Sequence, residues 1–321
     1  MFDYQAKKKI IQVKEWRCLL CFLLVTLFQL NRAAERSALL PGASGSTRGH
    51  DLIMKNEENG WKNVHVFAGD DRYLIKKRGK SQCMQDDLIL ALLFNKENGY
   101  FVDLAANDPV SLSNTFKLEQ VANWKGICIE ANPAYWRPLS YRACHVVGAV
   151  IGESRMEEVR FKFHEGTKRL PSGGIEHADF DNTPNHPKTE SKTVPLLTVP
   201  LQEILQRLNA PKVIDYFSLD VEGAESFIMN SFPFEEYRFR LLTVERPKQD
   251  LVDILYEHNY RYLAAFNKFG DETVWAHVDD LPALNLTAIS SIGWIENDTN
   301  KMKIGGSPDQ PPKVITRSTI K

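Results

Sequence analysis

Four short apolar segments of this chain each end in an acidic residue, and these acids are the side chains best placed to do chemistry. The segments close with Asp103, Glu130, Asp220 and Glu245. A single acid after a strand is most often a turn residue or a helix N-cap. Four acids that close four strands of one parallel sheet would instead meet at its carboxyl edge. Such an edge would attract a cationic ligand by charge complementarity, and a carboxylate there could act as a general base.

The turn after Asp103 lacks the glycines of a dinucleotide site. Residues 104–109 read Leu-Ala-Ala-Asn-Asp-Pro, and the chain shows no P-loop lysine pattern. Dinucleotide folds need G-x-G-x-x-G because the backbone must approach a pyrophosphate closely. Glu130 closes the second strand, where its carboxylate can accept both ribose hydroxyls of an adenosine. A cofactor with a cationic centre and no pyrophosphate therefore fits, and S-adenosylmethionine has both properties.

Methyl transfer to a hydroxyl asks the protein chiefly to align the acceptor and remove its proton. The candidates for this base are Asp220, Glu222 and Glu245, and Asp220 is preferred because it ends the strand next to the cofactor strand. These acids could also bind a divalent cation that lowers the pKa of the hydroxyl, although nothing else in the sequence supports a metal. The structural alternatives are a helix-start charge for Glu222 and Glu225 and an ion pair with Arg246 for Glu245.

The elements that must position these acids follow the order of a parallel α/β sheet. Strands are expected at residues 100–104, 126–130, 144–151, 213–220 and 240–245. Helical spacing between the strands predicts βαβ units with right-handed crossovers. Residues 260–266 and 272–277 predict an antiparallel hairpin. Residues 168–193 are polar and without a period, so they predict a long loop.

Composition bounds the class of protein. The 321 residues allow one large or two ordinary domains, and a hydrophobic content of 43% supports a full core. The net charge of -1 gives no support for nucleic-acid binding. The five cysteines show no metal-site spacing. Cys128 and Cys144 fall in expected strands, where either buried thiols or a disulfide would fit.

The amino terminus carries a short apolar segment, Cys18–Leu30, behind a basic flank. It is shorter than the roughly 20 residues of a full bilayer span, so it fits a signal-peptide core or a short signal anchor. Arg32 stands where cleavage would need a small residue, which favours an uncleaved anchor. The basic side would stay cytoplasmic and place the rest in the ER/Golgi lumen, with a secreted or organellar chain as the alternative. Sequons at Asn285 and Asn297 agree with a lumenal location.

The domain organisation expected from these features has four parts. They are a basic flank and anchor over 1–36, a stem over 37–80, a globular domain over 81–280 and a disordered tail over 281–321. The stem is rich in serine and glycine near its start, and the tail is rich in glycine, proline and lysine.

Three motifs of the globular domain resemble the FkbM-type methyltransferases. They are residues 101–108 together with Ser113–Thr115, residues 126–133, and residues 220–225, and the similarity runs from about residue 82 to 278. The chain departs from the family's first motif, Asp-x-Gly-Ala-Asn-x-Gly, because Ala105 and Pro109 replace glycines. Ala105 would fit this turn if the backbone there avoids positive φ.

The resemblance implies a fold and a function. The fold would be α/β and doubly wound, a class I (Rossmann-like) mixed seven-stranded sheet that ends in an antiparallel hairpin. The activity would be S-adenosylmethionine-dependent O-methylation of a small-molecule or glycan acceptor. The eukaryotic membrane-anchored branch acts in trafficking, so a tethered binding protein that retains the fold without catalysis is the alternative.

The resemblance also implies which residues contact the cofactor. Asp103 and Asn107 would hold its amino-acid end, and Glu130 its ribose. The full set implied for cofactor binding is Asp103, Ala105, Asn107, Ser113, Asn114, Glu130, Asn132 and Asp220.

Overall fold

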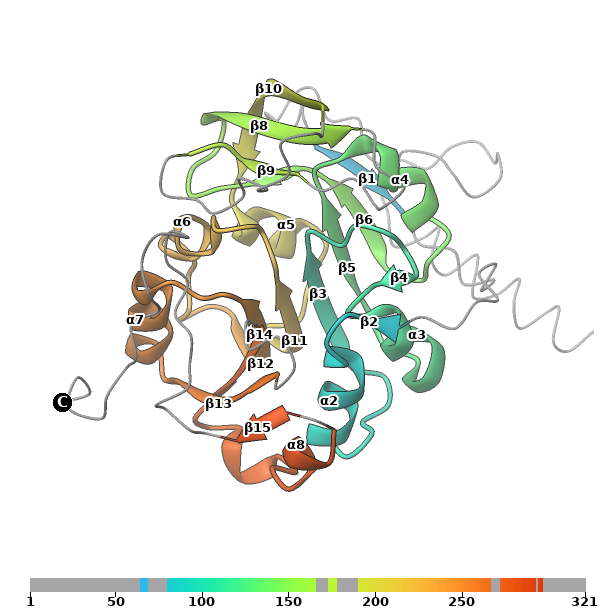
Figure 1. Ribbon diagram of the computed structural model, residues 1–321, viewed down its shortest axis with the longest axis vertical. Helices are drawn as coiled ribbons and strands as arrows, with labels where there is room; N and C mark the ends of the chain where they lie inside the picture. Colours follow the sequence, from blue (N-terminus) through green and yellow to red (C-terminus); the bar gives the residue numbers. More distant parts are fainter. Residues whose placement is uncertain are drawn as a thin grey trace, which may run out of the picture. The chain divides into compact units, whose positions relative to one another are not determined.

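A large mixed sheet forms the centre of the domain (Figure 1). The computed structural model describes residues 64–68, 80–165, 173–177, 190–266, 272–292 and 294–296. Within these residues the sheet has nine strands. The strands are β1 (His65–Phe67), β3 (Tyr100–Leu104), β5 (Lys125–Glu130), β6 (His145–Gly148), β11 (Val213–Leu219), β12 (Arg238–Glu245), β13 (Tyr260–Phe266), β14 (Glu272–His277) and β15 (Trp294–Glu296). Their spatial order is β1-β6-β5-β3-β11-β12-β14-β13-β15.

The five central strands are parallel and give the sheet its doubly wound topology. β5 and β6 extend the sheet on one side of β3, and β11 and β12 extend it on the other. The strand order therefore reverses between β3 and β11, which is the position where open α/β sheets bind ligands beyond the carboxyl ends of their strands. The predicted mixed α/β sheet is confirmed by this pairing.

The predicted hairpin is also confirmed, but the predicted number of strands is too low. β13 and β14 pair antiparallel, and β14 adds to β12. Two short strands extend the expected seven, because β1 pairs antiparallel with β6 and β15 pairs antiparallel with β13. Each has only three residues, and the predicted seven-stranded sheet included neither of them.

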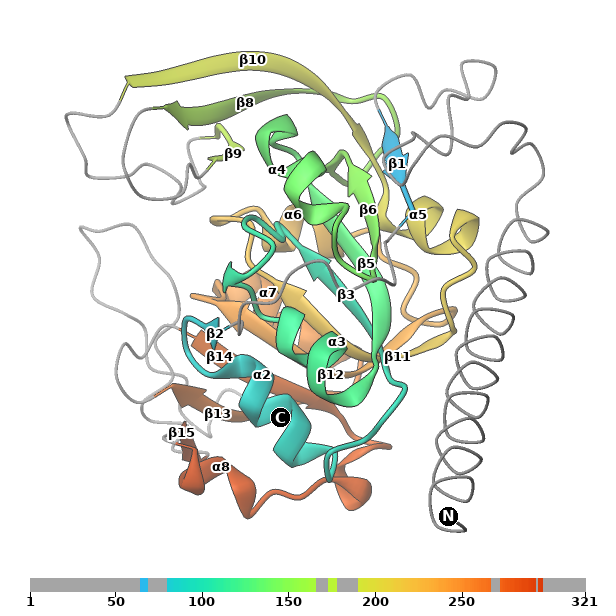
Figure 2. The same ribbon diagram turned by 90° about the vertical axis from the view of Figure 1, so that its right-hand side faces the viewer.

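Helices cover both faces of the sheet (Figure 2). They are α2 (Gln85–Leu92), α3 (Phe116–Ala122), α4 (Pro133–Leu139), α5 (Leu201–Arg207), α6 (Glu225–Met229), α7 (Gln249–Glu257) and α8 (Ala288–Ser291). One hydrophobic cluster joins the sheet to α5, α6 and α7, and a second joins it to α2, α3, α4 and α8. Because side chains alternate along a strand, Val102 and Leu104 of β3 pack in the first cluster and Phe101 packs in the second.

A second, smaller sheet corrects two predictions. Its strands are β7 (Val150–Ile151), β8 (Glu158–Glu165), β9 (Gly173–Ile175) and β10 (Glu190–Val199), in the order β7-β10-β8-β9. The strand predicted at 144–151 is split at Ala149, because β6 pairs in the large sheet and β7 pairs with β10. Within the described residues, the loop predicted at 168–193 contains β9, the two residues 176–177 after it and the start of β10. A short pair of strands, β2 (Lys80–Ser81) and β4 (Ser111–Leu112), completes the sheets of the described residues.

Both predicted ends of the globular domain need correction. β1 belongs to the sheet, so the stem predicted over 37–80 ends too late. Residues 281–296 form η2 (Leu281–Ala283), α8 and β15, so the tail predicted to be disordered from 281 begins too early. Trp294 is buried, and its indole N–H donates to the carbonyl oxygen of Cys83 over 3.1 Å. The predicted anchor lies outside the described residues, and no helix within them is long and apolar enough to span a bilayer.

Candidate active site

A hollow lies at the carboxyl ends of β3, β5 and β11, where the strand order reverses. Leu104 pairs with Ile129 on one side and Leu219 on the other, so the three strand ends are adjacent. Residues from β7, β8 and β9 complete the wall. The hollow has a volume of about 100 Å³, and a groove of about 550 Å³ borders it at Ile175. Sequence-predicted site residues that line the hollow are Ala105, Asn107, Glu130, Asn132, Asp220 and Glu222.

Glu130 is fixed at the hollow by backbone donors from two turns. The amide of Asn107 donates to Glu130 Oε2 over 2.8 Å, and the amide of Asn132 donates to Oε1 over 2.7 Å. The side chain is only 7% exposed, and this burial raises the pKa of Glu130 to about 7. Each carboxylate oxygen has two lone pairs, so both can accept a further hydroxyl. Asn132 also begins α4, because its Oδ1 accepts from the amide of Ala134 over 3.0 Å.

The turn after β3 takes the backbone shape that glycine favours. Ala105 has φ 64° and Asn107 has φ 51°, so the condition under which alanine would fit this turn is not met. The amides of Ala105 and Ala106 both donate to the carbonyl oxygen of Ile129, at 2.9 and 3.1 Å, and these bonds fold the turn tightly over the end of β5. Asparagine tolerates the left-handed region better than alanine does. Asn107 Oδ1 is buried at the hollow without a hydrogen-bond partner among the described residues.

Asp220 and Glu222 line the other side of the hollow, and the carboxylate of Glu245 lies close to theirs. Oxygens of Asp220, Glu222 and Glu245 lie within 4.8 Å of one another. Burial raises the pKa of Asp220 well above its usual value, and the nearby charges of Glu245, Glu222 and Glu272 raise it further. The geometry can hold either a shared proton or a divalent cation.

Arg246 balances part of this negative charge. Its Nη2 lies 3.1 Å from Glu222 Oε2 and 3.4 Å from Glu245 Oε2, so the ion pair considered for Glu245 is present. Glu222 has φ 58° and precedes α6, so it is not the helix-start charge considered as its alternative role.

Asp103 lies away from this hollow, so the four strand-ending acids do not converge as predicted. Its Oδ2 accepts from the hydroxyl of Thr115 over 2.5 Å, on the face of β3 that also carries Phe101. The physical reason is strand alternation, because Leu104 faces the hollow and its neighbour Asp103 must face the opposite way. Burial raises the pKa of Asp103, and the positive charge of Arg142 acts against that rise.

Ser113 and Asn114 also lie outside the set of hollow-lining residues. Ser113 Oγ accepts from the amide of Phe116 and from Arg142 Nη1, over 3.2 and 3.1 Å. Asn114 Nδ2 donates to Ser218 Oγ over 2.9 Å and ties this segment to β11. Asn114 Oδ1 is buried without a partner among the residues that the structure describes. Ser113 and Asn114 therefore hold the segment before α3 in place through contacts with Arg142 and β11.

Comparison with known proteins gives the family of this fold. Residues 103–262 match the family model of the methyltransferase FkbM domain. These residues form an FkbM methyltransferase domain. Among solved structures, the domain is similar to a precorrin-6y C5,15-methyltransferase from Geobacter metallireducens GS-15, with 12% identity, a TM-score of 0.32, and coverage of 65% of this chain and 92% of that one. No curated protein matches this sequence.

The FkbM domain uses a buried arginine that the sequence reading missed. Arg142 has a fully buried side chain, and its Nη2 donates to Thr115 Oγ1 over 2.8 Å and pairs with Glu119 Oε1 over 3.0 Å. Together with the bond to Ser113, these contacts connect α3, the segment before it and the segment before β6. Arginine and glutamate separated by 23 residues carry no periodic signal in the sequence.

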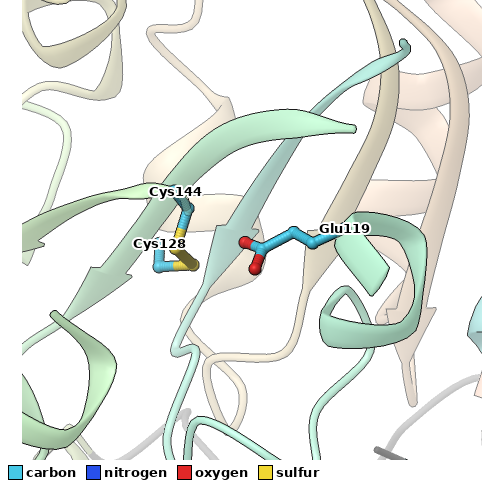
Figure 3. A group of neighbouring side chains, drawn as sticks. All are labelled: Glu119, Cys128 and Cys144. Carbon is cyan, nitrogen blue, oxygen red and sulfur yellow. A yellow bond between two sulfur atoms is a disulfide. The ribbon is translucent and has the colours of Figure 1, made fainter. Parts of the chain in front are cut away.

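A disulfide lies beside this ion pair. Cys128 of β5 is bonded to Cys144, directly before β6, and the Glu119 carboxylate points toward the two sulfur atoms (Figure 3). The amide of Ala143 also donates to Glu119 Oε2 over 3.3 Å. The disulfide that the sequence left open is thus present in the FkbM domain, and it restrains the segment that carries Arg142.

Glu225 lies in the first turn of α6, which is the helix-start position considered for it, and its carboxylate has a further role that the sequence did not predict. It is 2% exposed, and its Oε1 accepts from the amides of Val221 and Gly223 over 3.2 and 3.1 Å. Burial raises the pKa of Glu225 to about 7. Gly223 has φ 99°, which suits glycine alone, and its carbonyl oxygen accepts from Lys248 Nζ over 3.2 Å. Glu225 therefore fixes the loop that presents Asp220 to the hollow.

Proposed function

We propose that this protein is an S-adenosylmethionine-dependent O-methyltransferase that acts on a hydroxyl of a small molecule or glycan. The observation that carries this proposal is the hollow of the FkbM domain, where Glu130, Asn107 Oδ1 and Asp220 meet at adjacent strand ends. This set combines an acceptor for ribose hydroxyls, an unpaired acceptor for an ammonium group and a general-base candidate.

The residues of the hollow fit an adenosyl cofactor. The Glu130 carboxylate already holds two backbone donors and keeps lone pairs for the ribose hydroxyls. The buried Oδ1 of Asn107 lacks a partner among the described residues, and an ammonium group would satisfy it. Ala105 and Asn132 complete this wall. When bound, S-adenosylmethionine supplies a methyl group activated by its sulfonium.

Asp220 is the general base of this proposal. The charges of Glu245 and Glu222 raise its pKa, and a carboxylate with a higher pKa is the stronger base once ionised. Glu222 and Glu245 would support the proton transfer through this coupling, and Arg246 limits the repulsion among them. A divalent cation held by the three carboxylates would serve the same purpose by lowering the pKa of the acceptor hydroxyl.

The acceptor would approach through the groove that borders the hollow. The groove is lined by charged and polar side chains, including Glu157, Arg160 and Asn230, and it meets the hollow at Ile175. Such a lining can hydrogen-bond a hydroxyl-rich acceptor, which supports a glycan or polar small molecule over an apolar one.

We also propose that the domain lies in the ER/Golgi lumen, anchored by Cys18–Leu30. The Cys128–Cys144 disulfide supports this location because disulfides persist in oxidising compartments. A secreted or organellar chain is the alternative.

A second function has one observation in its favour. Ala105 occupies a left-handed position where the family pattern has glycine, and this costs about 1 kcal/mol of backbone strain. A membrane-tethered binding or trafficking protein could tolerate that strain without turnover.

Labelled methyl transfer from S-adenosylmethionine to pools of glycans and small hydroxyl compounds separates the two functions. The full chain should label at least one pool, and Asp220→Asn should reduce the rate of labelling by at least about 100-fold. Isothermal titration with S-adenosylmethionine and its demethylated product runs in parallel. No heat with either compound and no label would contradict the enzyme and favour the binding protein.

A further inference from the structure

The turn between η2 and α8 carries the tripeptide Asn285-Leu286-Thr287. The sequence N-x-[ST] with x other than proline is the acceptor pattern for N-linked glycosylation. The second such tripeptide of the chain, at Asn297, lies outside the described residues. The tripeptide at Asn285 lies within the described residues.

The backbone of this turn is fixed, with Thr287 exposed and Asn285 partly exposed. The amide of Asn285 donates to the carbonyl oxygen of Leu92 over 2.8 Å, which attaches the turn to the end of α2. Leu286 is 39% exposed, a large value for leucine, and Thr287 is exposed. Asn285 itself is partly exposed, so the tripeptide is accessible at the surface.

The side-chain bond within the tripeptide leaves one atom available. Thr287 Oγ1 donates to Asn285 Oδ1 over 2.7 Å. Asn285 Nδ2, the atom that a glycan would modify, makes no hydrogen bond to any described residue. The carboxamide is thus oriented by the threonine of its own motif, with its nitrogen unengaged.

We propose that Asn285 is modified by an N-linked oligosaccharide. In the transfer, Nδ2 forms a bond to the anomeric carbon of an oligosaccharide carried on a lipid pyrophosphate. The bond from that carbon to the pyrophosphate oxygen breaks, the lipid pyrophosphate leaves, and Nδ2 loses a proton to a base of the transferase. No electrons are exchanged. This inference uses the lumenal location proposed above but not the methyl-transfer activity.

The position of Asn285 keeps a glycan away from the hollow. Leu92 ends α2 and precedes the amino end of β3, whereas the hollow lies at the carboxyl end of β3. Both views place α8 at the end of the domain away from β8 and β10, whose sheet contributes to the hollow (Figures 1 and 2). The oligosaccharide would therefore cover surface beside α2 and α8 and leave access to the site.

The test is expression of the full chain in a eukaryotic secretory cell, followed by treatment with peptide N-glycosidase. Wild type should lose mass on a gel, and mass spectrometry should find aspartate at position 285, because the enzyme converts a glycosylated asparagine. Asn285→Gln and Thr287→Ala should each lower the apparent mass of the untreated protein on the gel by the mass of one oligosaccharide. Thr287→Ser, which keeps the hydroxyl, and Asn297→Gln are the matched controls. Both should still carry an oligosaccharide at position 285.

Protease protection of sealed microsomes distinguishes the two ways in which this test can fail. A protected chain with asparagine still unmodified at position 285 would overturn the proposal and leave the lumenal location standing. An unprotected chain without a glycan would overturn both. Binding of S-adenosylmethionine by Asn285→Gln should equal that of wild type, since the turn lies away from the hollow.

Discussion

The backbone amide of Asn107 donates to Glu130 Oε2 over 2.8 Å, and this bond ties the turn after β3 to the end of β5. The turn before this amide, in which Ala105 has φ 64° and the amides of Ala105 and Ala106 donate to Ile129, directs the Asn107 N–H toward Glu130. The same turn leaves Asn107 Oδ1 buried at the hollow without a partner among the described residues. One hydrogen bond therefore positions both acceptors that the proposed cofactor would use.

Two buried glutamates make the stability of the domain depend on pH. The pKa values of Glu130 and Glu225 rise to about 7 from an ordinary value of 4.5. Between these values the folded chain binds more protons than the unfolded chain, so the free energy of unfolding falls as pH rises through this window. Denaturant titrations across the window should show that fall.

Glu225→Gln isolates one share of this pH dependence. Its amide oxygen can still accept from Val221 and Gly223, but it does not titrate in the window. The variant should fold and show a shallower fall in stability with rising pH. A slope equal to that of wild type would show that Glu225 does not carry a raised pKa.

Ala105→Gly should stabilise the protein by about 1 kcal/mol, because glycine adopts positive φ without the Cβ strain that alanine has. Ala106→Gly is the matched control: its neighbouring position has no positive φ, so glycine there should destabilise. Chemical denaturation measures both. A loss of stability in Ala105→Gly comparable to that in the control would mean that the turn is not strained.

Removal of the Cys128–Cys144 disulfide should lower the free energy of unfolding by about 3 kcal/mol, the magnitude for a loop of this length. The double variant Cys128→Ala/Cys144→Ala and reduced wild type should unfold at similar denaturant concentrations. Reductant should have no further effect on the double variant. If reductant leaves wild-type stability unchanged under unfolding conditions, these cysteines are not paired.

Asp220→Asn should reduce methyl transfer by about 10²- to 10⁴-fold, the usual contribution of a general base, while binding of S-adenosylmethionine changes little. Asp253→Asn on the exposed side of α7 is the matched control and should keep full activity. Single-turnover rates with a labelled acceptor separate the two effects. A rate unchanged in Asp220→Asn would assign the proton transfer to another group.

Local sequence patterns predicted the strands of the sheet well, but they did not predict how distant elements pack together. The hairpin strands Tyr260–Phe266 and Glu272–His277 match their predicted bounds, because alternation and a polar turn are local signals. Glu130 and Asp220 reach one hollow because parallel strands share a carboxyl edge. The hairpin and the common carboxyl edge of the parallel strands could therefore be predicted from patterns that span only a few residues.

The parts that escaped prediction depend on contacts between distant residues. Which face of β3 the hollow occupies is decided by the small sheet packed over it, so Asp103 could not be placed from its own strand. The Arg142–Glu119 pair joins two elements that share no period. Ala105 could not be assigned a positive φ, because residue type alone argues against it.

The binding of S-adenosylmethionine at Glu130 is the central claim, and isothermal titration of the full chain tests it most directly. Wild type should bind, and Glu130→Ala should bind at least about tenfold more weakly, since it loses hydrogen bonds to a charged acceptor worth about 1.5–3 kcal/mol. Glu235→Ala, at an exposed position, is the matched control and should bind as wild type does. No heat with wild type, or equal affinity in Glu130→Ala and wild type, would contradict the account.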